Sequence, residues 1–62
     1  MKYSELERKL RGDGCYESGE KNGHPLWYSP ITKKHFKMSH HKSKEVANGT
    51  LKSIRNDSGV KL

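Results

Sequence analysis

The short length of the chain is the strongest limit on its fold. Its 62 residues suffice for one small domain, and a chain of this size buries only about 60% of the surface that it exposes when unfolded. Only 29% of the residues are apolar, so ordering the backbone, at roughly 1–2 kcal/mol per residue, leaves a small net stability. We therefore predict a single domain over residues 1–62 with a small core, to which a bound partner would add stability.

Positive charge is the second constraint. Thirteen Lys and Arg residues against seven Asp and Glu residues give a formal net charge of +6, which attracts polyanions such as nucleic acids. Charge also keeps small domains dissolved, so basicity alone does not decide between these two interpretations. Cys15 is the only cysteine, which excludes an intramolecular disulfide and a cysteine-rich zinc site.

The sequence shows no targeting or membrane segment. The first residues, Met1 to Glu5, turn polar at once, and no later stretch approaches the roughly 20 apolar residues of a membrane span. A single cysteine also suits a reducing compartment. We therefore expect a cytoplasmic protein that does not associate with membranes.

Residue spacing near the start predicts a first helix. Ser4 and Glu7 have the spacing of a capping box, in which each side chain accepts a hydrogen bond from the other residue's backbone. Leu6 and Leu10 then lie one above the other on a helix face. These signals predict a helix over residues 4–11, and the glycines that follow it supply the turn.

Three short strands are predicted after this helix. The strands are expected at residues 15–17, 24–29 and 34–38. A hairpin loop at 18–23 should join the first two, and residues 31–33 should connect the second to the third. Phe36 and Met38 alternate with polar neighbours in the last strand and should face the core. His35 and Lys37 should face solvent.

A second helix completes an α+β fold. After a polar loop at 39–47, Asn48 should cap a helix that ends at Gly59 in a Schellman motif, with Val60 folded onto Ile54. A sheet of so few strands needs both helices on one face to bury its apolar side. This αβββα order, with a three-stranded antiparallel sheet, is the arrangement of the double-stranded-RNA-binding domain, and it leaves the other face of the sheet open.

The predicted central strand carries the main candidate for chemistry. Trp27 is the largest apolar side chain and should be the centre of the core. Alternation places the residues two positions before and after it on the same side, and places His24, Leu26 and Tyr28 on the open side. Pro25 also restricts the residue before it to extended geometry, which holds His24 at the start of the strand.

An exposed imidazole beside lysines suits RNA cleavage. Histidine can take or give a proton near neutral pH, which typically contributes a factor of about 10²–10⁴ in rate. Removing the ribose 2′-OH proton, or protonating the leaving 5′ oxygen, can cleave RNA without a metal. Exposed strand histidines and solvated lysines are also common without such a role. Candidate contacts to RNA phosphates are basic or lie at a helix start: Lys21, Lys33, Lys34, Lys37, Lys42, Lys44, Gly49 and Thr50.

Other ring side chains are weaker candidates for binding. The histidines lack the spacing of a zinc site, and adjacent His40 and His41 cannot easily turn to one ion, so we expect no metal cofactor. Tyr28 could stack on a nucleic-acid base, but one tyrosine alone is a weak platform, and Trp27 is expected in the core.

Two stretches of the sequence resemble the HicA toxin family. Residues 22–30, Asn-Gly-His-Pro-Leu-Trp-Tyr-Ser-Pro, are similar to the family segment Gly-Ser-His-His-x-aromatic-x-His-Pro, with a histidine, the aromatic residue and the final proline in register. Residues 41–54 resemble its segment His-x-x-Lys-Glu-Leu-x-x-Gly-Thr-Leu-Arg-Ser-Ile, which is followed by a glycine like Gly59. The opening, Lys2–Gly14, is similar too, so the resemblance covers nearly the whole chain.

The resemblance implies the toxin of a type II toxin–antitoxin pair. Such a toxin is a ribonuclease that cleaves messenger RNA without a metal, and a HicB antitoxin neutralises it by covering the active face. In this chain, the resemblance implies that His24 is the catalytic residue. Pro25 stands where the family often has a second histidine, which leaves Tyr28, His35, His41 or water as the second proton carrier. The alternatives are a non-catalytic module that binds structured RNA through its lysines, and an adaptor that binds only protein.

Overall fold

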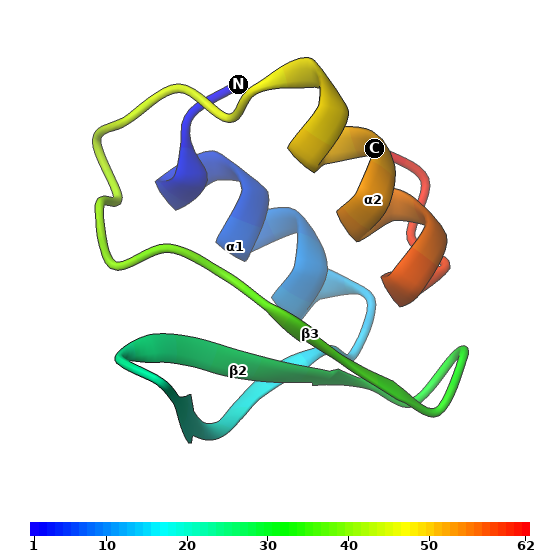
Figure 1. Ribbon diagram of the computed structural model, residues 1–62. Coiled ribbons are helices and arrows are strands. Elements are labelled where there is room, and N and C mark those ends of the chain that lie inside the picture. Colours follow the sequence, from blue (N-terminus) through cyan, green and yellow to red (C-terminus); the bar gives the residue numbers. More distant parts are fainter.

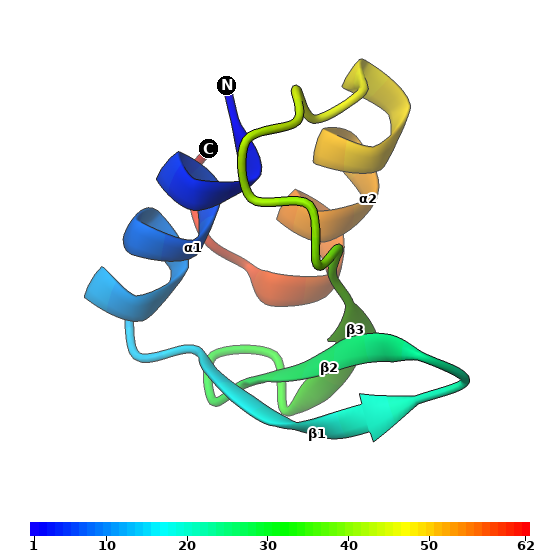
Figure 2. The same ribbon diagram turned by 90° about the vertical axis from the view of Figure 1, so that its left-hand side faces the viewer.

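The computed structural model describes residues 1–62 and contains α1 (Tyr3–Gly12), β1 (Tyr16–Lys21), β2 (His24–Ser29), β3 (Lys34–Lys37) and α2 (Asn48–Ser58). The strands form one antiparallel sheet in the order β1-β2-β3. Both helices lie on one face of this sheet (Figure 1), and the turned view shows the other face uncovered (Figure 2). The predicted α+β fold is therefore confirmed. Neither helix is long and apolar enough to cross a membrane.

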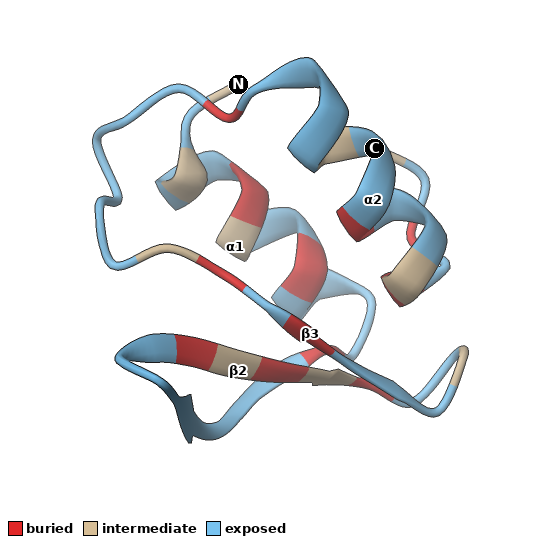
Figure 3. Ribbon diagram, in the orientation of Figure 1, coloured by how far each residue is buried: buried red, intermediate tan, exposed pale blue.

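The core lies between the sheet and the two helices. Trp27 is 1% exposed, and the guanidinium carbon of Arg11 lies 4.8 Å from the centroid of its ring. Figure 3 shows the buried positions on the facing sides of helices and strands. Nine buried residues form the apolar cluster: Leu6, Leu10, Cys15, Trp27, Phe36, Met38, Val46, Ile54 and Val60. The predicted inward positions in β2 and β3 are confirmed.

The first hairpin is tighter than predicted. Residues 18–21 belong to β1 and not to a loop, and the chain reverses within two residues, Asn22 and Gly23, at φ of 54° and 79°. Positive φ at both positions is typical of a type I′ turn, which an Asn-Gly pair favours because its twist matches that of the strands. Gly19, interpreted as a loop residue, instead follows a register irregularity that begins at Glu17.

The predicted capping box of α1 is wrong. No side chain caps this helix, and Ser4 lies inside its first turn, so the pair that it was expected to form with Glu7 is absent. The amides of Tyr3 and Ser4 instead donate to the carbonyl oxygens of Lys44 and Lys42, at 3.0 and 2.9 Å. The loop before α2 therefore supplies the acceptors that the first amides of a helix need.

The predicted side-chain cap of α2 is also absent. Asn48 is the first helical residue, and Ala47 precedes it as the N-cap in extended conformation. The amide of Leu51 donates to the carbonyl oxygen of Ala47 at 2.8 Å. The amides of Asn48, Gly49 and Thr50 have no hydrogen-bond partner within the chain, so they remain free to bind a ligand.

The end of α2 is close to the prediction but uses a simpler motif. Gly59 has a left-handed φ of 73°, and its amide donates to the carbonyl oxygen of Arg55 at 2.9 Å. The amide of Val60 donates to Ser58 Oγ at 3.2 Å and not to the helix backbone, so the motif is the αL type and not the Schellman type. The predicted burial of Val60 with Ile54 is confirmed.

Two side chains fix the end of α2 to the sheet. Ser29 Oγ, at the end of β2, donates a hydrogen bond to the carbonyl oxygen of Ser58. Thr32 Oγ1, in the β2–β3 connection, donates to the carbonyl oxygen of Asp57. Carbonyls in the last turn of a helix have no helical partner, so these hydroxyls satisfy them and hold α2 over β2.

The start of the chain pairs with the segment before α2. Lys2 and Glu45 form an isolated antiparallel bridge, and the amide of Val46 donates to the carbonyl oxygen of Met1 at 2.9 Å. The Met1 ammonium lies 2.9 Å from Glu45 Oε2, and this hydrogen-bonded contact holds the pKa of the Glu45 carboxyl below its usual value.

Candidate functional site

His24 is exposed on the face of the sheet that carries no helix. It is the first residue of β2 and lies opposite Lys21 across the two-residue turn. Pro25 follows it and is buried, so the strand alternates as expected and directs the imidazole away from the core. The tight hairpin therefore presents one imidazole and one ammonium group at its tip.

A second histidine contacts the same turn. His40 Nε2 lies 2.6 Å from the carbonyl oxygen of Gly23, the residue before His24, and 3.5 Å from Glu20 Oε1. Because a carbonyl oxygen can only accept, Nε2 carries the hydrogen in this contact. The sequence suggested His40 only as a metal ligand, because residue spacing does not show that the chain after β3 returns along the first hairpin. Nowhere do three His, Cys, Asp or Glu side chains gather as a metal site would require.

Two other candidates for a second proton carrier, Tyr28 and His35, lie away from His24. Tyr28 is near the opposite end of β2, where it pairs with Tyr16 of β1 and with His35 of β3. The Tyr28 ring centroid is 5.6 Å from that of Tyr16 and 4.8 Å from that of His35. We call these three side chains the aromatic row. His41 is exposed in the loop before α2. Tyr28 is thus one of three adjacent rings, an arrangement that depends on strand register and is not evident from the sequence.

Two of the predicted lysines lie on the open face of the sheet. Lys21 is opposite His24 at the hairpin tip, and Lys37 is opposite Leu26 in the middle of the sheet. Both are exposed. They place positive charge along the path between the hairpin tip and the aromatic row.

The structure separates the other four predicted lysines from His24. Lys33 and Lys34 are exposed at the β2–β3 turn, at the end of the sheet away from the first hairpin. Lys42 and Lys44 are exposed in the loop whose carbonyls cap α1, and Lys42 Nζ lies 3.7 Å from Glu7 Oε1. These four lysines form two peripheral pairs and not one cluster with the imidazole.

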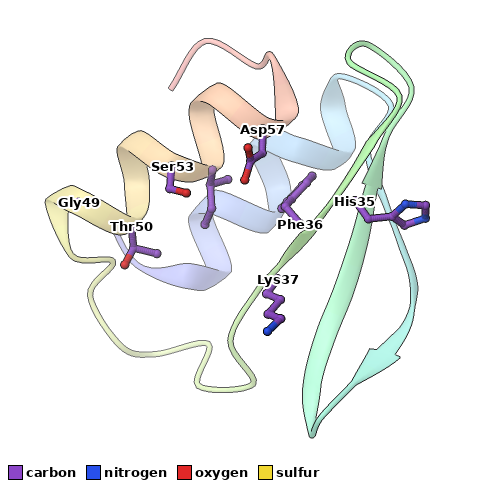
Figure 4. Close-up of a pocket in the computed structure, with 8 residues that line it drawn as sticks. His35, Phe36, Lys37, Gly49, Thr50, Ser53 and Asp57 are labelled. Atoms are coloured by element: carbon purple, nitrogen blue, oxygen red, sulfur yellow. The ribbon is translucent and has the colours of Figure 1, made fainter.

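An open hollow between β3 and α2 gathers three predicted phosphate contacts (Figure 4). Lys37 lines this hollow from β3, and Gly49 and Thr50, whose amides have no hydrogen-bond partner within the chain, line it from the start of α2. Asp57 lies at the end of the hollow away from Lys37, so the Lys37 end is the one that suits an anion. The lining residues are His35, Phe36, Lys37, Gly49, Thr50, Ser53, Ile54 and Asp57. His24 stands outside this hollow, on open surface.

Comparison with known proteins identifies one family. The family model described as the HicA toxin of bacterial toxin–antitoxin systems matches residues 3–60, which include both helices, the whole sheet and His24. Comparisons with curated proteins and with solved structures gave no match.

Proposed function

Because the chain belongs to the HicA toxin family of bacterial toxin–antitoxin systems, we propose that it is a metal-independent endoribonuclease that cleaves messenger RNA. In this proposal His24 is the general acid–base residue. The observation that supports it most is the exposure of His24 beside Lys21, on the one face of the sheet that no helix covers. A polynucleotide can reach such a residue without entering a cleft.

The proposed reaction begins when the imidazole removes the proton of a ribose 2′-OH. The 2′ oxygen then forms a bond to the adjacent phosphorus, and the bond between phosphorus and the 5′ oxygen breaks. The leaving oxygen takes a proton from water or from a second acid, so the products carry a 2′,3′-cyclic phosphate and a 5′-hydroxyl. The Lys21 ammonium would stabilise the negative charge that develops on the phosphorane.

We propose that the RNA backbone follows the positive charge around this site. Lys21 lies beside the scissile phosphate, Lys37 contacts the backbone further along the open face, and the amides of Gly49 and Thr50 at the start of α2 bind another phosphate. The peripheral lysines would add weaker contacts to longer RNA: Lys33, Lys34, Lys42 and Lys44. Binding should weaken as salt rises, because each phosphate contact releases counterions.

Membership of a toxin–antitoxin family implies an antitoxin as partner. We propose that this antitoxin is of the HicB type and covers the open face of the sheet. Its binding would keep RNA away from His24, and it would also bury surface that the small core leaves exposed.

A cleavage assay with His24→Ala tests the proposed function. Labelled RNA is incubated in excess EDTA with the native protein, with His24→Ala, with His41→Ala and with Asn56→Ala as the control, because Asn56 is exposed on α2 and has no part in the proposed site. We expect the rate to fall by about 10²–10⁴ in His24→Ala and to be unchanged in Asn56→Ala. A fall in His41→Ala would identify His41 as the second proton carrier.

Two results would contradict this assignment. Cleavage by His24→Ala at the native rate would remove this imidazole from the reaction. Salt-dependent RNA binding without cleavage, by the native protein as well as by the variant, would favour the alternative of a non-catalytic module that binds structured RNA.

A further inference from the structure

The aromatic row crosses all three strands on the open face. Tyr16, Tyr28 and His35 are direct cross-strand partners, with neighbouring ring planes inclined at 49° and 55°. Tyr16 is 50% exposed although it is a large aromatic residue. Each ring packs against its neighbour, so the three rings form one continuous surface across the strands.

The charge around the aromatic row suits a polyanion. Glu17 and Glu20, the carboxylates of the sheet, pair with Trp27 and Pro25, which are buried on the helix side. Paired residues point to the same face of a sheet, so both carboxylates lie on the helix side. The open face of the strands therefore carries aromatic and basic side chains, Lys37 among them, together with Leu26 and no carboxylate.

We propose that the aromatic row stacks on unpaired RNA bases, so that the substrate of this site is single-stranded RNA. Base stacking on tyrosine and histidine rings needs bases that are splayed out, which a duplex does not offer. This inference rests on the proposed function, because it names the form of RNA that reaches His24. It assigns the sheet to base binding although the fold resembles that of a double-stranded-RNA-binding domain.

The geometry of β2 connects the aromatic row to the imidazole. Tyr28 and His24 lie on the same strand and face, four residues apart, which corresponds to about 13 Å at ~3.3 Å per residue. A single strand whose base stacks on the aromatic row can therefore place a phosphate at His24 within a few nucleotides. Lys37, between them on the neighbouring strand, would contact the backbone along this path.

A binding assay with an uncleavable probe tests this inference. The probe is a short labelled oligouridine with 2′-O-methyl riboses, which lacks the nucleophile for cleavage, and a matched abasic probe carries the same phosphates without bases. Fluorescence anisotropy measures the affinity of the native protein and of Tyr16→Leu, Tyr28→Leu, Tyr16→Phe and Tyr28→Phe. Circular dichroism and thermal unfolding verify that each variant is folded.

We expect each leucine variant to bind the oligouridine about 5- to 150-fold more weakly, the effect of losing one stacked base. The phenylalanine variants keep the ring and should bind within about twofold of the native protein, since stacking does not need the hydroxyl. All five proteins should bind the abasic probe equally, because phosphate contacts do not involve these rings.

Equal affinity of folded leucine variants and native protein for the oligouridine would overturn the inference. If these variants also escaped a HicB-type antitoxin, the aromatic row would belong to a protein interface. The outcome is separable from that of the proposed function, because His24→Ala should cleave RNA about 10²–10⁴-fold more slowly yet bind the probe with native affinity. Base-dependent binding without cleavage would support the stacking site and contradict the nuclease.

Discussion

The two sides of strand β2 have different roles in the molecule. The inward side carries Trp27, the centre of the core, and Ser29, and both are at most 1% exposed. The outward side carries the exposed His24 and the half-buried Tyr28, on the face without helices. Because successive strand residues point to opposite faces, one segment of six residues supplies both the core and the candidate site. Substitutions on the two sides should therefore separate stability from activity.

The largest effect is expected for Trp27→Ala on the inward side. Replacing a buried tryptophan by alanine costs about 3–5 kcal/mol, and here it also removes the stacking of Arg11 on the ring. A domain of this size has a total stability of roughly 3–9 kcal/mol, so a large part of the variant population should be unfolded. Urea unfolding followed by circular dichroism measures the change. His24→Ala, on the outward side, should change the free energy of unfolding by less than about 0.5 kcal/mol.

A similar loss of stability in both variants would break this comparison. It would mean that the imidazole packs into the domain, and a fall in RNA cleavage by His24→Ala could then not be attributed to chemistry.

A smaller effect is expected for Ser29→Ala, which tests a polar group on the inward side. Ser29 Oγ donates to the buried carbonyl of Ser58 and accepts from the amide of Ile31 at 3.2 Å. Its removal leaves two groups without a partner and should cost about 1–3 kcal/mol. Ser18→Ala is the matched control, because Ser18 Oγ also donates to a backbone carbonyl, that of Leu26 at 3.2 Å, but is exposed. Thermal unfolding should show a loss below about 0.5 kcal/mol for the control.

Well below its unfolding temperature, Ser29→Ala should cleave RNA at the rate of the native protein. A reduced rate in the folded variant would show that the position of α2 over β2 affects the site, and the separation between the two sides of the strand would then be incomplete.

The sequence contained enough local information to predict the fold. Alternation located the strand over 24–29 and placed Trp27 inward and His24 outward, because a period of two decides which face each residue occupies. The hairpin prediction was wrong although the signal was present: Asn22-Gly23 is a strong two-residue turn, and the glycine content of 18–23 was interpreted as a longer loop.

Contacts between distant segments were not predictable in the same way. Ser4 and Asn48 are good capping residues, but loop carbonyls bind the first amides of α1, and the extended conformation of Ala47 starts α2 one residue earlier than a cap at Asn48 would. The aromatic row likewise depends on strand register, which pairs Tyr16 with Tyr28 only after the length of the turn is known. A single sequence does not supply these pairings.

His40 is the clearest case of a residue that only the structure connects to the candidate site, and it gives the smallest predicted effect. Its Nε2–H donates to the carbonyl oxygen of Gly23, so it should hold the peptide that precedes His24. Loss of one such hydrogen bond is worth about 0.5–1.5 kcal/mol, which corresponds to a fall in kcat of about 2- to 12-fold in His40→Ala. His40→Gln keeps an N–H donor and should recover part of the rate.

Steady-state cleavage assays separate this positioning role from RNA binding. In His40→Ala we expect kcat to fall while KM stays unchanged, because the side chain is exposed and holds the hairpin tip instead of the core. The free energy of unfolding should fall by no more than the ~0.5–1.5 kcal/mol of the lost hydrogen bond. An increase in KM at unchanged kcat would instead identify His40 as an RNA contact. Equal loss of kcat in His40→Ala and His40→Gln would show that the imidazole itself takes part in proton transfer, and the single-histidine mechanism proposed for His24 would then be incomplete.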